Sequence, residues 1–213
     1  MGRLSFALRL ILNYGSDQRC PFCNSAETKA LERKQALLVL RKCSRCHLMY
    51  RWPKDTASRN WQFYQRAYKQ SGITTDLPDE EEIMRLRATR FAGTDRDFVL
   101  HIAVLKALCP AERVLDFGCS WGYGTFQLKQ AGYDVLGFEI SKPRADFGRH
   151  HLGVEIIDDL SALEMLPDAG FDAIYASHVL EHLTSLREPF ALFSRLLKPG
   201  GVLFIMVPNC GGD

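Results

Sequence analysis

The sequence predicts an α/β protein in which a doubly wound parallel sheet follows a small metal-binding module. From residue 113 onward, five short apolar runs alternate with segments of helical periodicity, a pattern typical of a parallel sheet covered on both faces. Between residues 18 and 50, four cysteines form two C-x-x-C pairs, which is the spacing of a zinc ribbon. The 213 residues are enough for one full domain and one such module, and 46% hydrophobic with 24% charged residues exclude a disordered chain or a coiled coil.

The cysteine pairs of the first module are separated by 19 residues and consist of Cys20, Cys23, Cys43 and Cys46. Two such knuckles can turn four thiolates toward one point, which suits a structural Zn²⁺ ion. Residues 28–31 and 36–41 have the length of a hairpin between the knuckles, and a module this small needs the metal for much of its folding energy. The alternatives are a redox pair, which would need a C-x-x-C beside a βαβ pattern, and unrelated buried cysteines. His47 in place of one sulfur ligand is a third alternative.

Three further cysteines stand alone in the sequence, at Cys109, Cys119 and Cys210. We interpret them as small buried hydrophobes in a reducing compartment, which predicts a cytoplasmic protein. Residues 1–17 are interpreted as a short, basic, amphipathic segment. Because no apolar run approaches the ~20 residues of a membrane helix, we expect no membrane-spanning segment.

Charge is divided unevenly along the chain. Residues 1–70 carry 14 Lys and Arg against 4 Asp and Glu, whereas residues 71–213 carry 13 against 21. The basic part predicts an acidic partner, which is nucleic acid, a phosphorylated or nucleotide-linked small molecule, or the chain's own acidic part.

Residues 51–95 are interpreted as a connector or lid. Six aromatic and five basic side chains alternate over residues 50–70, and Trp61, Tyr64 and Tyr68 recur at helical spacing. This stretch is therefore expected to be a helix that packs on the next domain, with the wall of a substrate pocket or a stacking surface for bases as the alternatives.

The elements of the second domain follow two helices expected at residues 81–91 and 97–108. Strands are expected at residues 114–117, 135–138, 154–157, 171–176 and 202–207, and helices at residues 125–131, 144–151 and 190–197. The first strand ends in a glycine-rich turn, DFGCSWGYG, and Glu139 closes the next strand 23 residues after Asp116. Since glycines allow close backbone approach and a strand-end carboxylate can bind ribose hydroxyls, this spacing predicts a nucleoside-containing cofactor. A tight turn beside a solvated Glu139 is the alternative.

Residues 96–213 resemble the class I S-adenosylmethionine-dependent methyltransferases, which have a Rossmann-like doubly wound sheet. VLDFGCSWGYG resembles the first motif of that family, with Ser120 where a glycine usually stands. FDAIYASHVLEHL resembles the fourth motif, and LLKPGGVLFIMVPN the fifth strand with its preceding turn. The family usually adds two further strands, so the resemblance implies a sheet that lacks them, in a C-terminally truncated or a minimal domain.

The resemblance also implies S-adenosylmethionine as the cofactor and assigns residues to it. The first motif would hold the methionine part through Asp116, Gly118, Cys119, Ser120 and Gly122. Glu139 and Ile140 would meet the ribose, and Asp159 with Leu160 the adenine.

Two histidines of the fourth motif, His178 and His182, are expected at the acceptor edge of the sheet. A base assists methyl transfer to oxygen or carbon, and we expect His178 first and His182 second in this catalytic role. Contacts to cofactor or backbone, and helix packing, are the alternatives. The same residues spell H-x-x-E-H, a pattern of some zinc peptidases, but it follows a strand of a cofactor-binding sheet without the remaining peptidase context.

The order of a CPxC and CxxC ribbon, an aromatic stretch and this domain resembles bacterial methyltransferases of sugar and natural-product biosynthesis. We therefore expect a small-molecule acceptor such as a sugar or nucleotide-linked metabolite. An rRNA or tRNA methyltransferase that docks through its basic zinc module is the second hypothesis. A non-catalytic, cofactor-binding remnant is the third, favoured only by the missing strands.

Overall fold

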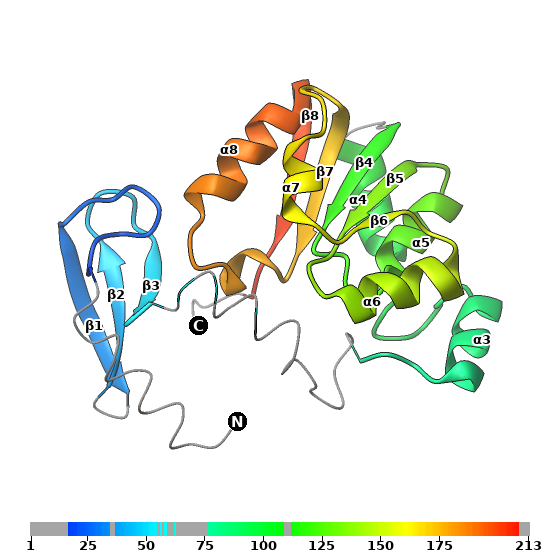
Figure 1. The fold of residues 1–213 in the computed structure, drawn as a ribbon, viewed down its shortest axis with the longest axis horizontal. Helices are drawn as coiled ribbons and strands as arrows, with labels where there is room; N and C mark the ends of the chain where they lie inside the picture. The colour runs from blue at the N-terminus through cyan, green and yellow to red at the C-terminus, as the bar shows by residue number, and fades with distance from the viewer. Residues whose placement is uncertain are drawn as a thin grey trace. The chain divides into compact units, whose positions relative to one another are not determined.

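A computed structural model describes residues 17–34, 37–54, 56, 58, 62, 76–108 and 112–208. The chain forms two compact units, the first from Met1–Phe63 with Leu183–Phe190 and the second from Tyr64–His182 with Ala191–Asp213 (Figure 1). The N-terminal segment before Asp17, the aromatic helix expected around Trp61, Tyr64 and Tyr68, and the lone Cys109 and Cys210 lie outside the described residues. The domain boundaries at residues 17, 50 and 95 stay predictions.

The first unit contains an antiparallel sheet in the order β1-β2-β3. Its strands are Thr28–Lys34 (β1), Leu38–Cys43 (β2) and Met49–Trp52 (β3). The sequence predicted only the hairpin of β1 and β2, so β3 is an addition. Along β3 the buried Tyr50 and Trp52 alternate with the exposed Met49 and Arg51, as expected for a strand with one covered face.

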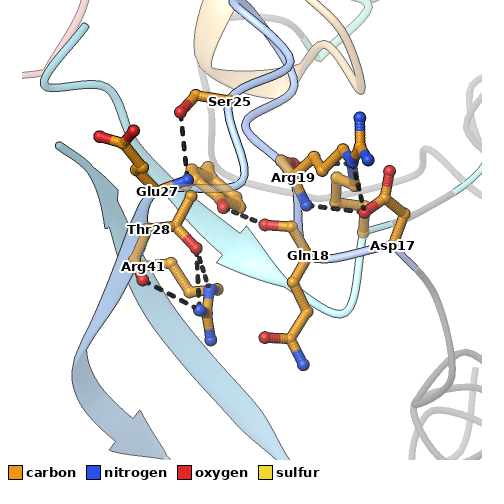
Figure 2. A network of polar contacts seen from close by, with 9 residues as sticks. Asp17, Gln18, Arg19, Ser25, Glu27, Thr28 and Arg41 are labelled. Carbon is orange, nitrogen blue, oxygen red and sulfur yellow. Dashed lines mark hydrogen bonds and ion pairs between the residues drawn. The ribbon is translucent and has the colours of Figure 1, made fainter. Parts of the chain in front are cut away.

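Hydrogen bonds join the knuckle region to this sheet (Figure 2). Arg41 on β2 donates from Nη2 to Thr28 Oγ1 on β1 at 2.8 Å and from Nε to the same oxygen at 3.2 Å. The Tyr50 hydroxyl on β3 donates to the carbonyl of Gln18, just before the first cysteine. The Arg41 bonds thus connect β1 with β2, and the Tyr50 bond ties the start of the module to β3.

The segment Leu183–Phe190 belongs to the first unit and contacts its first knuckle. Ser185 Oγ donates to the Pro21 carbonyl at 3.3 Å, and Arg187 Nε donates to the Phe22 carbonyl at 3.3 Å. The rings of Phe22 and Phe190 meet edge to face at 5.9 Å. Two backbone carbonyls of the C-P-F-C knuckle thus hold this segment.

The second unit is built on a parallel sheet with strand order β6-β5-β4-β7-β8. The order reverses at β4, which lies between β5 and β7, and this is the switch point at which α/β sheets bind ligands. The strands are Arg113–Phe117 (β4), Asp134–Phe138 (β5), Ile156–Ile157 (β6), Phe171–Ser177 (β7) and Leu197–Met206 (β8). The predicted Rossmann-like α/β fold is confirmed, with five strands among the described residues.

The helices of this unit begin and end close to the predicted positions, with two differences. The helix expected at 144–151 is α6 followed by a π turn, and α7 was not predicted. The helices are Glu80–Ala88 (α3), Val99–Leu108 (α4), Tyr123–Gln130 (α5), Lys142–Phe147 (α6), Leu160–Glu164 (α7) and Arg187–Leu196 (α8). No helix in the described part of the chain is both long and apolar enough to span a membrane.

Helices pack on both faces of the sheet because side chains alternate along its central strand. Val114 of β4 points into a cluster with Leu105 of α4 and Leu128 of α5, and all three are almost fully buried. Phe117 of β4 points to the opposite face, where its ring meets Phe193 of α8 edge to face at 4.8 Å. Burial on both faces explains the nearly continuous apolar character of β4.

Candidate functional site

The turn between β4 and α5 approaches its surroundings so closely that two positions require glycine. Gly118 and Gly122 have φ angles of +80° and +79°. A Cβ atom at Gly118 would lie 2.2 Å from Val179 Cγ2, and one at Gly122 would lie 2.9 Å from Val154 Cγ2. The glycines of the first motif therefore serve backbone conformation and close packing together.

Ser120 lies at the middle of this turn with a φ angle of +54°, a conformation that favours glycine. Its amide donates to Glu139 Oε2 at 3.0 Å. Its Oγ is buried and has no hydrogen-bond partner among the described residues. A buried hydroxyl without a partner is costly, so this atom fits a position where a bound ligand completes the bonding.

Glu139 follows β5 and is 8% exposed. In addition to the Ser120 amide, its carboxylate accepts the amide of Ser141 at 2.7 Å, on Oε1. Burial raises the pKa of Glu139, against the opposing effects of the Ser141 amide, the nearby Arg144 and the Ser120 amide. The alternative interpretation of Glu139 as a solvated strand end is therefore wrong, because this carboxylate is buried and braces the glycine turn.

Asp116 is the second-last residue of β4 and is 4% exposed. Thr125 Oγ1 on α5 donates to its Oδ2 at 2.7 Å. Burial raises the pKa of Asp116 to about 7, partly offset by the Thr125 hydrogen bond, and the charge of Glu139 raises it further. Two interacting carboxyl groups, both buried, thus lie at the ends of adjacent strands, as the spacing of 23 residues predicted.

The other predicted cofactor residues lie on the same edge of the sheet but differ in their environment. Cys119 is buried, and Ile140 is half-buried after β5. Asp159 caps α7, because its Oδ1 accepts the amide of Ala162 at 3.1 Å, and Leu160 beside it is 50% exposed. Their assignment to ribose and adenine stays a prediction.

The two candidate catalytic histidines flank one carboxylate after β7. His178 Nδ1 lies 3.5 Å and His182 Nε2 3.8 Å from Glu181 Oε1, and both imidazoles are more than half exposed. His178 has a φ angle of +54°, and only Leu180–His182 form a single 3₁₀ turn. The peptidase pattern works with both histidines on one helix, so the local structure argues against that interpretation.

The four knuckle cysteines converge in the first unit, as predicted. Their Sγ atoms all lie within 4.8 Å of one another, with Cys20 and Cys46 at 3.5 Å and Cys23 and Cys43 at 3.5 Å. Four thiolates around Zn²⁺ at ~2.3 Å would be separated by about 3.8 Å. The hydrogen bond from the Cys46 backbone, more than that from Arg45, lowers the pKa of Cys43 to about 6 against the effect of burial. The cysteine set therefore fits a structural zinc ion.

Several supporting residues escaped the sequence analysis. Thr125 and Ser141 hold the two carboxylates, and Trp121 anchors the glycine turn in a cluster with Ile83 and Leu86 of α3. A threonine in the first turn of a helix, such as Thr125, and a serine after a strand, such as Ser141, are common in many proteins. Their role could therefore not be identified from one sequence. Only Trp121 carried a signal, as a large apolar side chain inside a glycine turn.

Residues 115–205 match the sequence family described as "Methyltransferase domain". This stretch, which is less than half of the chain, belongs to that methyltransferase domain family. An uncharacterized methyltransferase of Synechocystis is 32% identical over 129 residues, which cover 58% of this chain and 59% of that protein. A ubiquinone biosynthesis O-methyltransferase of Nitrosococcus oceani is 33% identical over 104 residues, covering 46% of this chain and 44% of that protein.

A plant enzyme is also among the relatives. Phosphoethanolamine N-methyltransferase 3 of Arabidopsis thaliana is 31% identical over 104 residues, covering 46% of this chain and 21% of that protein. The chain thus spans between 21% and 59% of the length of these three relatives.

Solved structures include similar chains at lower identity. A methyltransferase from Thiobacillus denitrificans in complex with S-adenosylhomocysteine is 20% identical, with a TM-score of 0.41 over 61% of this chain and 55% of that one. A TehB-like methyltransferase from Corynebacterium glutamicum is 24% identical, with a TM-score of 0.42 over 59% of this chain and 70% of that one. Neither likeness bears on the substrate.

Proposed function

We propose that this chain is a methyltransferase that uses S-adenosylmethionine to methylate a small molecule. The observation that carries the proposal is the glycine turn braced by a buried carboxylate, with the unpartnered Ser120 Oγ inside it. The match to the methyltransferase domain family supports the reaction class. Two relatives are named for small molecules, ubiquinone and phosphoethanolamine, and this supports a small-molecule acceptor.

The residues of the turn suit the parts of this cofactor. Gly118 and Gly122 leave backbone without side chains where a ligand can approach, and Ser120 Oγ offers a hydrogen bond. Asp116 and Glu139 present carboxylates to amino or hydroxyl groups at the ends of β4 and β5. Asp159 and Leu160 at the start of α7 would border the adenine.

Proton removal from the acceptor is the work left to the protein side chains. When bound, the sulfonium supplies an activated methyl group, so the protein needs to orient an acceptor rather than provide a nucleophile. His178 would take the acceptor proton, with Glu181 3.5 Å from its Nδ1 to stabilise the charged imidazole. His182, on the other side of Glu181, is the second candidate.

The test is calorimetric titration of S-adenosylhomocysteine into the zinc-loaded chain. Glu139→Gln should weaken binding at least 10-fold, because its amide nitrogen would face a backbone N–H that the carboxylate now accepts. The matched control is Asp134→Asn at the opposite end of β5, where the side chain is 73% exposed. The proposal would be contradicted if the folded wild-type protein did not bind S-adenosylhomocysteine. It would also be contradicted if Glu139→Gln and Asp134→Asn bound it with equal affinity.

A sugar or nucleotide-linked metabolite is the finer acceptor class we propose. Its support is the arrangement of a cysteine ribbon before the methyltransferase domain, together with the basic first part of the chain, which suits a phosphorylated substrate. Methyl-labelled S-adenosylmethionine incubated with purified nucleotide-sugars and with free sugars should label the former. Labelling of neither set would refute this acceptor class.

RNA is a second candidate substrate, favoured by one feature of the ribbon sheet. The exposed Lys29 of β1 lies directly opposite the exposed Lys42 of β2, and like charges in this position destabilise a sheet. A phosphate backbone would relieve the repulsion. Binding of a labelled RNA hairpin that weakens with salt and with Lys42→Gln, but not with the exposed Lys106→Gln of α4, would favour it.

A further inference from the structure

A histidine from α4 meets a tyrosine from β7 inside the second unit. The Tyr175 hydroxyl and His101 Nδ1 lie 2.8 Å apart, although 74 residues separate them in sequence. Tyr175 is 1% exposed, and its ring stacks on Phe204 of β8 at 5.3 Å. Because Tyr175 is held on all sides, it fixes the position of the His101 ring rather than the reverse.

The second nitrogen of His101 remains available. Phe98 contacts the imidazole edge to face at 4.6 Å, and the ring is half-buried. Within the described part of the chain, Nε2 of His101 makes no hydrogen bond. Tyr175 therefore occupies one ring nitrogen and leaves the other to a ligand or to solvent.

The pair lies at the carboxyl end of the sheet, next to the candidate catalytic turn. The Tyr175 hydroxyl lies 3.8 Å from the sulfur of Met206, the last residue of β8. The carbonyl of that same Met206 accepts the amide of His178 at 2.8 Å. One residue, Met206, thus connects the Tyr175–His101 pair with the turn that carries His178.

The surroundings of His101 favour its neutral form, mainly through burial. Burial lowers the pKa of His101, and a positive charge on His178 lowers it further, while Asp97 before α4 acts in the opposite direction. Burial also raises the pKa of Tyr175, so the tyrosine stays protonated. Among the residues that the structure describes, Asp97, Tyr175 and His178 are the titratable groups that act on His101.

We propose that His101 is a further acceptor-binding residue of this site, whose Nε2 hydrogen-bonds the methyl acceptor while Tyr175 holds its Nδ1. The inference rests on the proposed methyltransferase function and deepens it. A neutral imidazole close to the turn that carries His178 can bind a hydroxyl or amino group without competing for its proton, which His178 would take. The chemical class of acceptor that fits is one with two neighbouring hydroxyl or amino groups, one for each histidine.

Imidazole NMR tests the coupling without knowledge of the acceptor. In protein labelled with ¹⁵N-histidine, His178→Gln should raise the pKa of His101, because a nearby positive charge is removed. Tyr175→Phe should change the tautomer of His101, which is read from its ring nitrogen shifts. His150→Gln is the matched control, since His150 is exposed and bonds the Asp146 carbonyl. Equal effects of His178→Gln and the control would overturn the inference.

A second measurement separates this inference from the proposed function. His101→Asn should retain S-adenosylhomocysteine affinity within about twofold and lose at least 10-fold in methylation of vicinal diols, tested with purified nucleotide-sugars and labelled cofactor. Loss of cofactor affinity in this variant would overturn the role of His101 in acceptor binding. Absence of cofactor binding by the wild-type chain would instead refute the proposed function, while the NMR result would still decide whether the histidines are coupled.

Discussion

Gly118→Ala is the sharpest perturbation that the structure offers, because the glycine turn touches the turn that carries the candidate catalytic histidines there. Gly118 has a φ angle of +80°, and an added Cβ would lie 2.2 Å from Cγ2 and 2.9 Å from Cγ1 of Val179. Real Cβ atoms are not found at such distances, so Val179 or the backbone must move. Val179 comes directly after His178, which makes the displacement relevant to the site.

The expected loss of stability has two parts. A residue with a Cβ costs roughly 1–2 kcal/mol in the left-handed region, and forcing an extra methyl group into a packed interior costs about 1–3 kcal/mol. Gly118→Ala should therefore lower the free energy of unfolding by about 2–5 kcal/mol. Gly153→Ala is the matched control, because φ there is +63° and no atom lies within 4 Å of the added Cβ. Gly153→Ala should therefore show only the conformational cost of roughly 1–2 kcal/mol.

Urea unfolding of the zinc-loaded protein measures both variants, compared at equal slopes. The double variant Gly118→Ala/Val179→Ala should recover much of the second part, because both interfering methyl groups are removed. Equal destabilisation by Gly118→Ala and Gly153→Ala would refute the close packing of the two turns. A double variant that loses the sum of both single effects would refute it as well.

Three further predictions concern charge, metal and backbone conformation. Burial raises the pKa of Asp116 to about 7 in the folded protein, against roughly 3.9 in the unfolded chain. The folded protein therefore binds this proton more tightly, and the resulting contribution to the free energy of unfolding is complete below pH ~4 and is lost as the pH rises through 7. Asp116→Asn should thus stabilise the protein by on the order of 2–4 kcal/mol at pH 8 and little at pH 4 in urea titrations, and an equal gain at both pH values would contradict this. Cys43→Ser should abolish zinc binding measured by elemental analysis, whereas Cys119→Ser should keep one zinc per chain; retained zinc in the first variant would exclude the four-sulfur site. Ser120→Gly should raise the free energy of unfolding by up to about 1 kcal/mol, because glycine adopts the φ angle of +54° without strain. The same variant should bind S-adenosylhomocysteine more weakly in calorimetry. Unchanged affinity would show that Ser120 Oγ does not contact the ligand.

The strands of the second unit could be predicted from the sequence where the local pattern and the fold agree. Apolar runs such as 114–117 and 135–138 lie within one residue of β4 and β5, because strands buried on both faces must be apolar throughout. The short β6 was overestimated, since Val154 is buried but only Ile156–Ile157 pair with β5. The bulge of β8 was missed because Gly200, with φ of +80°, lets residues 198–201 loop out between two paired segments.

Site residues in short continuous motifs could be predicted from the sequence, whereas contacts between distant residues could not. Asp116, Gly118, Gly122 and the four knuckle cysteines follow from spacing, since each motif is short and continuous. Asp159 also caps α7, which a motif alone does not reveal because the amide it accepts belongs to a helix absent from the prediction. The pairing of His101 with Tyr175 depends on how α4 crosses the sheet, and no local pattern encodes a contact between residues 74 apart.

The brace formed by Glu139 determines how the turn after β4 receives a ligand. Both carboxylate oxygens already accept backbone amides, one of them from Ser120 at the centre of that turn. The loop is therefore preorganised: it holds its binding conformation in the absence of any guest and gives up little conformational entropy when one arrives. Binding then occurs at a preformed site rather than by induced fit. Differences in affinity between cofactor analogues should therefore reflect how well each analogue fits this fixed shape, and not how well it orders the chain.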